Sequence, residues 1–138
     1  GGRRALAFVS VAGPASNVAL AFVFAGLFQI GLLSVDDISR GALESFSVRA
    51  WASIAATYAV QLNLILAVFN LLPVPPLDGG GIIAGIAPRA ALPAVQKLQQ
   101  FGPMVLLAVL LSTYVTDLNI LGTIFGPVID LTDVLIGA

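Results

Sequence analysis

The hydrophobic residues of this chain form long, nearly uninterrupted runs rather than the one-sided stripe of a soluble helix. Residues 14–33 and 51–72 are almost wholly apolar, and as helices rising 1.5 Å per residue each would be about 30 Å long. That length matches the hydrocarbon core of a bilayer, so we predict two membrane-spanning helices. The first begins at Pro14, where a proline suits the first turn, or it begins earlier and bends at Gly13-Pro14.

The second half of the chain is less regular. Residues 101–115 form a third apolar stretch, which is long enough to cross a bilayer only if the residues from Pro93 onward extend it or Gly102-Pro103 bends it. Residues 118–138 are apolar but interrupted by Gly126-Pro127, Asp130 and Asp133. A half-span, a surface helix and a fourth crossing all remain open for this last segment.

Two polar segments connect these elements. Residues 34–49 read as an extramembrane loop that can hold a short surface helix, and residues 88–100 read as a polar, basic connection. Basic segments mark the cytoplasmic side of a membrane protein, which places the arginines at positions 3 and 4 and the 88–100 connection there. We therefore expect a multi-pass protein of a prokaryotic cytoplasmic membrane, with Asp78 toward the cytoplasmic side.

The predicted fold class is all-α. We expect a single membrane-embedded domain over residues 1–138, with about three transmembrane helices, a broken helix or loop near residue 78 and a short apolar C-terminal segment. Composition supports the lipid environment, because 59% of the residues are hydrophobic, 9% are charged and the mean hydropathy is +1.04, against about 25% charged residues in soluble domains.

Two absences in the composition limit the chemistry. The chain has no cysteine, which excludes disulfides, thiolate catalysis and cysteine-ligated metal within it, and it has no histidine. Basic residues form no patch suited to nucleic acid. The sequence does not set the oligomeric state.

An unusual segment ends the second apolar run, where residues 70–81 read NLLPVPPLDGGG. Its three prolines lack backbone N–H groups and obstruct upstream carbonyls, so the helix must break there. Lipid cannot satisfy the exposed backbone groups of a broken helix, and such a break is tolerated only against protein or water. The segment therefore predicts a cavity, lined by a carboxylate at Asp78 that needs a cation, a proton or water.

A simpler interpretation of the same segment is a proline-rich turn at the cytoplasmic interface. In that case Asp78 is solvated and caps the following helix through its first N–H groups. A second motif favours the functional interpretation: Ala12-Gly13-Pro14-Ala15-Ser16-Asn17, in which an amide follows a Gly-Pro pair. Taken alone, Asn17 is more typical of a cap or an interhelical hydrogen bond.

Together the two motifs resemble the site-2 protease family of intramembrane zinc metalloproteases. The second matches that family's Asn-x-x-Pro-x-Pro-x-x-Asp-Gly pattern at every defined position, and the first matches its Gly-Pro-x-x-Asn element. The resemblance covers roughly residues 5–116. It implies hydrolysis of peptide bonds in or near transmembrane segments of substrate proteins, by a zinc-bound water.

The resemblance also implies roles for particular residues. Asp78 would be a zinc ligand, and Asn70 would position substrate or stabilise the reacting centre. Pro73, Pro75 and Gly79 would shape the cavity, and Asn17 would be a structural or substrate-proximal amide. Asn63, seven residues before Asn70, reads instead as a packing residue that hydrogen-bonds between helices.

The main departure from the family is the missing His-Glu-x-x-His helix, which supplies two zinc ligands and the general base. We expect this helix upstream of Gly1, so that the 138 residues are the C-terminal part of the protease and are inactive alone; a degenerate relative is the alternative. The rival class is a non-catalytic membrane protein, a transporter or scaffold, in which Asp78 relays protons or binds a cation.

Overall fold

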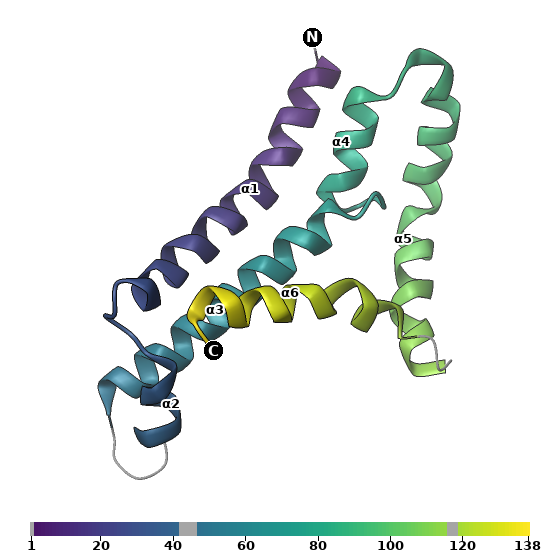
Figure 1. Ribbon diagram of the computed structural model, residues 1–138. Helices are drawn as coiled ribbons and strands as arrows, with labels where there is room; N and C mark the ends of the chain where they lie inside the picture. The colour runs from purple at the N-terminus through teal and green to yellow at the C-terminus, as the bar shows by residue number, and fades with distance from the viewer. Residues whose placement is uncertain (1, 42–46, 116–118) are drawn as a thin grey trace.

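The computed structural model describes residues 2–41, 47–115 and 119–138, and all of its regular secondary structure over these ranges is helical (Figure 1). Its elements in chain order are α1 (Gly2–Gln29), α2 (Val35–Gly41), α3 (Val48–Leu71), α4 (Asp78–Ile86), the 3-10 turn η1 (Arg89–Ala91), α5 (Leu92–Val115) and α6 (Ile120–Ile136). The predicted all-α class is confirmed. Among the described residues, three helices are long and apolar enough to cross a membrane: α1, α3 and the helix through η1 and α5.

The first membrane-spanning helix is longer than the predicted apolar run of residues 14–33. α1 begins at Gly2, and Pro14 lies buried in its interior, so a start at Pro14 is wrong and the earlier start is right. Proline normally breaks a helix interior, at a cost of about 3 kcal/mol. In lipid, however, a chain that left the helix would expose several backbone groups. The apolar residues on both sides of Pro14 therefore continue one helix.

The third span shows a similar extension. α5 begins at Leu92 and carries Pro103 inside it, so residues upstream of the apolar stretch lengthen the helix, as one of the predicted possibilities required. Residues 88–100 were predicted to be a polar connection, and this is wrong for most of them. Only Ala87 and Pro88 separate α4 from η1, and the polar residues that follow lie on helix.

The C-terminal segment is one continuous helix. α6 has 17 residues, includes Pro127 and begins with a cap in which the Asn119 side chain accepts a hydrogen bond from the N–H of Gly122 at 2.8 Å. Figure 1 shows α6 lying across the other helices rather than alongside them. It packs on α3, α1 and α5.

The larger core lies where α1, α3 and α6 meet. Alanines 21 and 25 of α1 and Ala56 of α3 are buried together, and such small side chains let helices approach closely in a membrane. Val128 and Ile136 of α6 close this core. Many large apolar side chains elsewhere are exposed, among them Phe8, Leu107 and Leu111, which is typical of a lipid-facing surface.

The end of the molecule opposite the chain start is fixed by polar contacts. Arg49, at the start of α3, forms an ion pair with Asp37 of α2 at 2.8 Å and donates a hydrogen bond to the carbonyl of Gly31. The predicted short surface helix in the 34–49 loop is thus present as α2. Residues 42–46 of this loop lie outside the described residues.

Candidate functional site

A break of six residues separates α3 from α4. α3 ends at Leu71 and α4 begins at Asp78, and short-range hydrogen bonds satisfy part of the intervening backbone. The N–H of Val74 donates to the carbonyl of Leu72 at 2.7 Å, and the N–H of Leu77 donates to that of Val74 at 3.0 Å. The peptide bond between Pro75 and Pro76 is cis. The proline-rich segment thus breaks the helix as predicted.

Glycines allow the chain to fold tightly at this break. A Cβ at Gly79 would overlap the carbonyl oxygens of Leu71 and Leu72, and a Cβ at Gly80 would lie 2.6 Å from Cγ of Pro75. Neither position therefore accommodates a side chain without a shift of the backbone. Gly79 was predicted to shape the site, and the structure places it directly against the end of α3.

Pro75 lies at the centre of this packing, whereas Pro73 lies at its edge. Besides Gly80, Pro75 contacts Gly102 of α5, where an added Cβ would lie 2.9 Å from the Cδ of the proline. The Pro73 side chain is exposed. Pro75 thus joins the break to the third span. The predicted cavity at the break stays a prediction.

Helix α4 packs antiparallel against the first half of α1. Gly85 of α4 lies against Ala7, Gly81 lies against Ser10, and Asp78 lies against Gly13. Positions nearer the start of α4 therefore contact positions further along α1, so the two helices run in opposite directions. At 1.5 Å per residue, Gly13 is about 17 Å from the start of α1. The break accordingly lies beside the middle of the first span rather than beside its end.

The Asp78 carboxylate is the chemically distinctive group of the break. An added Cβ at Gly13 would lie 2.6 Å from its Oδ2 atom, so the side chain is in direct contact with the Gly13 backbone. Asp78 is half-buried in the first turn of α4, and Leu77 rather than Asp78 is the N-cap residue. Within the described ranges the carboxylate has no hydrogen bond or ion pair.

The structure therefore brings together the two motifs, which are about sixty residues apart in the sequence. Asn17 follows Gly13 by four residues in α1 and so lies on the same helix face one turn further on. Asn70 occupies the last turn of α3, directly before the break. Both amides are half-buried. No hydrogen bond joins Asn17, Asn70 and Asp78 in the part of the chain that the structure describes.

Asn63 differs from Asn70. Its Nδ2 donates to the carbonyl of Ala59 at 2.8 Å, one turn earlier in α3. The predicted hydrogen bond of Asn63 to another helix is therefore wrong, because the amide is paired within its own helix. The interpretation of Asn63 as a residue without a role in the site is unaffected.

A comparison with protein families identifies the family of this chain. The model of peptidase family M50 matches residues 2–113 and so includes both motifs. The chain belongs to peptidase family M50. The resemblance to site-2 proteases inferred from the two motifs is thereby confirmed, and an integral, multi-pass membrane protein follows from the family and the three apolar helices.

Two curated proteins that are similar to this chain carry names that refer to zinc. The chain is 38% identical over 105 residues to the Bacillus subtilis (strain 168) protein named "Putative zinc metalloprotease YwhC", covering 76% of this chain and 45% of that protein. It is 37% identical over 75 residues to "Putative zinc metalloprotease MJ0611" of Methanocaldococcus jannaschii, covering 54% and 31% respectively. The chain thus spans less than half the length of either relative. No solved structure matches it.

The residues present do not complete a zinc site. Structural and catalytic zinc sites use at least three protein ligands, commonly His, Cys, Asp or Glu. No three such side chains are grouped closely enough to hold a metal ion in the described ranges. At the break, this stretch of the M50 protein offers one candidate ligand, Asp78, whose carboxylate makes no internal pair there.

Sequence reasoning missed two residues that shape this region. Ser10 is a buried polar residue of α1 that occupies the space left open by Gly81, and Gly102 of α5 receives Pro75. Gly102 had been considered only as a bend next to Pro103. The sequence signals were weak. Ser10 lies four residues before Pro14, and Gly102 lies in an apolar run, but neither fact specifies which helix packs against the residue.

Proposed function

We propose that these residues form part of a membrane-embedded zinc metalloprotease, in which Asp78 supplies one zinc ligand. The remaining ligands and the general base would come from a part of the protein outside these 138 residues. The observation that supports this proposal is the contact between Asp78 and Gly13, which joins the family's two motifs in one place. When bound, zinc activates a water molecule for attack on a carbonyl.

The protein's own residues would prepare that site in distinct ways. The absence of a side chain at Gly13 leaves room for the Asp78 carboxylate, and the first turn of α4 provides N–H groups that favour a negative charge there. The close fit of Gly79 against α3 limits the movement of Asp78. Preorganisation of this kind is what a metal ligand on a broken helix requires.

Asn70 would orient the substrate or stabilise charge at the reacting centre. It is the last polar residue before the break, and its amide is not paired within its helix, unlike that of Asn63. Pro73 and Pro75 would keep the backbone out of the helix between this amide and Asp78. Asn17, one turn beyond Gly13, would line the same space from α1.

The substrate would be a transmembrane or membrane-adjacent segment of another protein. The break lies beside the middle of α1, a helix long and apolar enough to span a bilayer. A carboxylate at that depth is costly unless it binds a cation or water. We further propose that this site is reached from the cytoplasmic side of a prokaryotic membrane, because Arg3, Arg4 and Arg89 lie at the end nearer to α4.

Replacement of the carboxylate tests the proposal. In the full-length protein in proteoliposomes, Asp78→Asn should lower bound zinc and cleavage of a membrane-spanning substrate, each by at least about tenfold, since even partners of metal ligands contribute that much. Asp130→Asn, which alters an exposed carboxylate of α6, is the matched control and should change neither. Wild-type cleavage by the Asp78→Asn protein would show that Asp78 is not part of the catalytic site. A wild-type protein without bound zinc would favour a non-catalytic membrane protein.

A further inference from the structure

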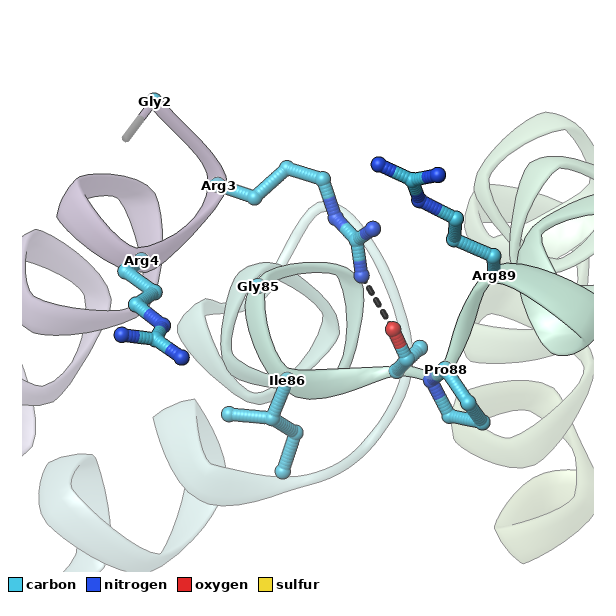
Figure 2. A pocket seen from close by; sticks show the side chains of 8 residues that line it. Gly2, Arg3, Arg4, Gly85, Ile86, Pro88 and Arg89 are labelled. Carbon is cyan, nitrogen blue, oxygen red and sulfur yellow. Dashed lines mark hydrogen bonds between the residues drawn. The ribbon is translucent and has the colours of Figure 1, made fainter.

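Three arginines surround a hollow at the end of the molecule where the chain starts. The hollow has a volume of about 810 Å³ and lies between the start of α1, the end of α4 and η1. Figure 2 shows Arg3 and Arg4 entering it from α1 and Arg89 entering it from η1, with the end of α4 between them. Among the described residues, no acidic side chain lines this hollow, and the charged side chains that do line it are all arginines.

Arg3 has a structural role in this hollow. Its Nε donates to the carbonyl of Ala84 at 3.3 Å, and its Nη2 donates to the carbonyl of Ala87. These carbonyls belong to the end of α4, where a cation is favoured by the helix dipole. Arg3 thereby attaches the start of α1 to the end of α4, and its own orientation is fixed.

Arg4 and Arg89 are differently placed. In the described part of the chain, neither side chain has an ion pair or a hydrogen bond, and in Figure 2 they lie on opposite sides of Arg3. Like charges gathered around one hollow repel one another, and an anion bound in the hollow would relieve that repulsion. A guanidinium binds phosphate oxygens through two parallel hydrogen bonds.

An apolar groove adjoins this basic hollow. It has a volume of about 490 Å³ and shares Arg4 and Ile86 with the hollow; its other lining residues are Ala7, Phe8, Val11 and Ile82. Phe8 is 78% exposed and Ile86 71% exposed. A single ligand that reached from the hollow into the groove would therefore need an anionic head and a hydrocarbon tail.

The position of the hollow along α1 suits such a ligand. With 28 residues, α1 is about 42 Å long, about 12 Å more than the hydrocarbon core of a bilayer. The first turns of α1, with Arg3 and Arg4, can therefore lie among lipid headgroups while Val11 reaches the level of the acyl chains. Basic pockets between membrane helices on the cytoplasmic side are suited to anionic lipid headgroups.

We propose that this surface binds an anionic glycerophospholipid, with its headgroup in the hollow that Arg4 and Arg89 line and an acyl chain in the groove lined by Phe8, Val11 and Ile82. The charge of the hollow selects an anion, and the adjoining groove selects a lipid over a free phosphate. Since Arg3 joins α1 to α4, and α4 begins with Asp78, the bound lipid would stabilise the packing beside the helix break. The inference does not depend on the metal proposal.

Lipid selectivity of the full-length protein tests the headgroup contact. Native mass spectrometry from mixed micelles of phosphatidylglycerol and phosphatidylcholine should show retained phosphatidylglycerol on the wild-type protein. Arg4→Gln and Arg89→Gln should each weaken that preference by about fivefold, the effect of one basic residue at a lipid surface. Lys97→Gln removes the same charge from an exposed residue of α5 outside the lining and should leave the preference unchanged.

A second pair of variants tests the acyl-chain contact. Val11→Trp would fill the groove and should displace phosphatidylglycerol, whereas Val9→Trp adds the same bulk at an exposed valine of α1 that does not line it. Glycerol 3-phosphate, which has the headgroup chemistry without a tail, should not compete with the lipid at equal concentration. Thermal unfolding shows that each variant is folded before its selectivity is compared.

Three results would overturn the proposal. One is equal retention of the two lipids by the wild-type protein. Another is an equal loss of preference in Lys97→Gln and Arg89→Gln, which would indicate general surface charge. The third is displacement of the lipid by glycerol 3-phosphate or by an acidic peptide at equal concentration, which would indicate a headgroup-only or a protein-binding site.

Discussion

At the scale of single residues, two asparagines of one helix differ in whether their side-chain amides are hydrogen-bonded. Asn63 and Asn70 are seven residues apart in α3, but the amide of Asn63 is paired with the carbonyl of Ala59. Asn70 has no such bond in the described structure and precedes the break. Of the two amides, only that of Asn70 is therefore without an intrahelical hydrogen bond in the described structure.

Alanine substitution of both amides separates these roles. In the full-length protein, Asn70→Ala should lower the cleavage rate by about 100-fold, the typical effect of removing one donor from a reacting centre, with bound zinc unchanged. Asn63→Ala, the matched control, should retain both cleavage and zinc. Equal losses of cleavage in the two variants would contradict a specific role for Asn70.

The sequence allowed prediction of the helix break, because the steric rules for proline are local, and of the family, because both motifs follow its pattern. It did not allow prediction of the neighbours of Asp78. Contact between Gly13 and Asp78, and between Gly102 and Pro75, depends on which helices pack together. Glycines in apolar runs look alike until the opposite helix is known.

At the scale of the helices, the contact between α1 and α4 sets the position of the Asp78 carboxylate. Gly13→Ala would put a methyl group 2.6 Å from Oδ2 of Asp78, while alanine favours the helix by about 1 kcal/mol over glycine. We therefore expect a folded protein with displaced Asp78 and cleavage lowered by about tenfold or more, since small misplacements at a reacting centre are costly.

Gly26→Ala is the control for this substitution. It makes the same change in the same helix, and nothing lies within 4 Å of the added Cβ. Cleavage assays paired with thermal unfolding distinguish a local displacement from a loss of fold. Wild-type cleavage by the Gly13→Ala protein would show that the carboxylate tolerates movement and is not a positioned ligand.

Helix boundaries were less predictable than helix number. Pro14 and Pro103 lie inside α1 and α5, although local sterics place proline at a first turn or a break. The cost of one missing hydrogen bond is smaller in lipid than that of leaving the helix altogether. At residues 72–77, by contrast, three prolines occur within four positions and the helix does end.

At the scale of the whole molecule, the arginines of α1 and η1 gather at one end, while Arg49 lies at the other with its partner Asp37. We expect the first end to face the cytoplasm. In a background without other cysteines, Ala90→Cys in η1 should react with a membrane-impermeant maleimide only from the cytoplasmic side. Val48→Cys at the start of α3 should react only from the opposite side. Labelling of both positions from one side would contradict this topology.

If Asp78 binds zinc, a change of the element that residue 78 presents to the metal should change the atoms around the zinc ion. The full-length Asp78→Cys protein, with residue 78 as its only cysteine, should show a sulfur atom about 2.3 Å from zinc in X-ray absorption spectra. The wild-type protein should show only nitrogen and oxygen neighbours. A stoichiometric zinc ion in the Asp78→Cys protein with no sulfur in its coordination shell would contradict the account.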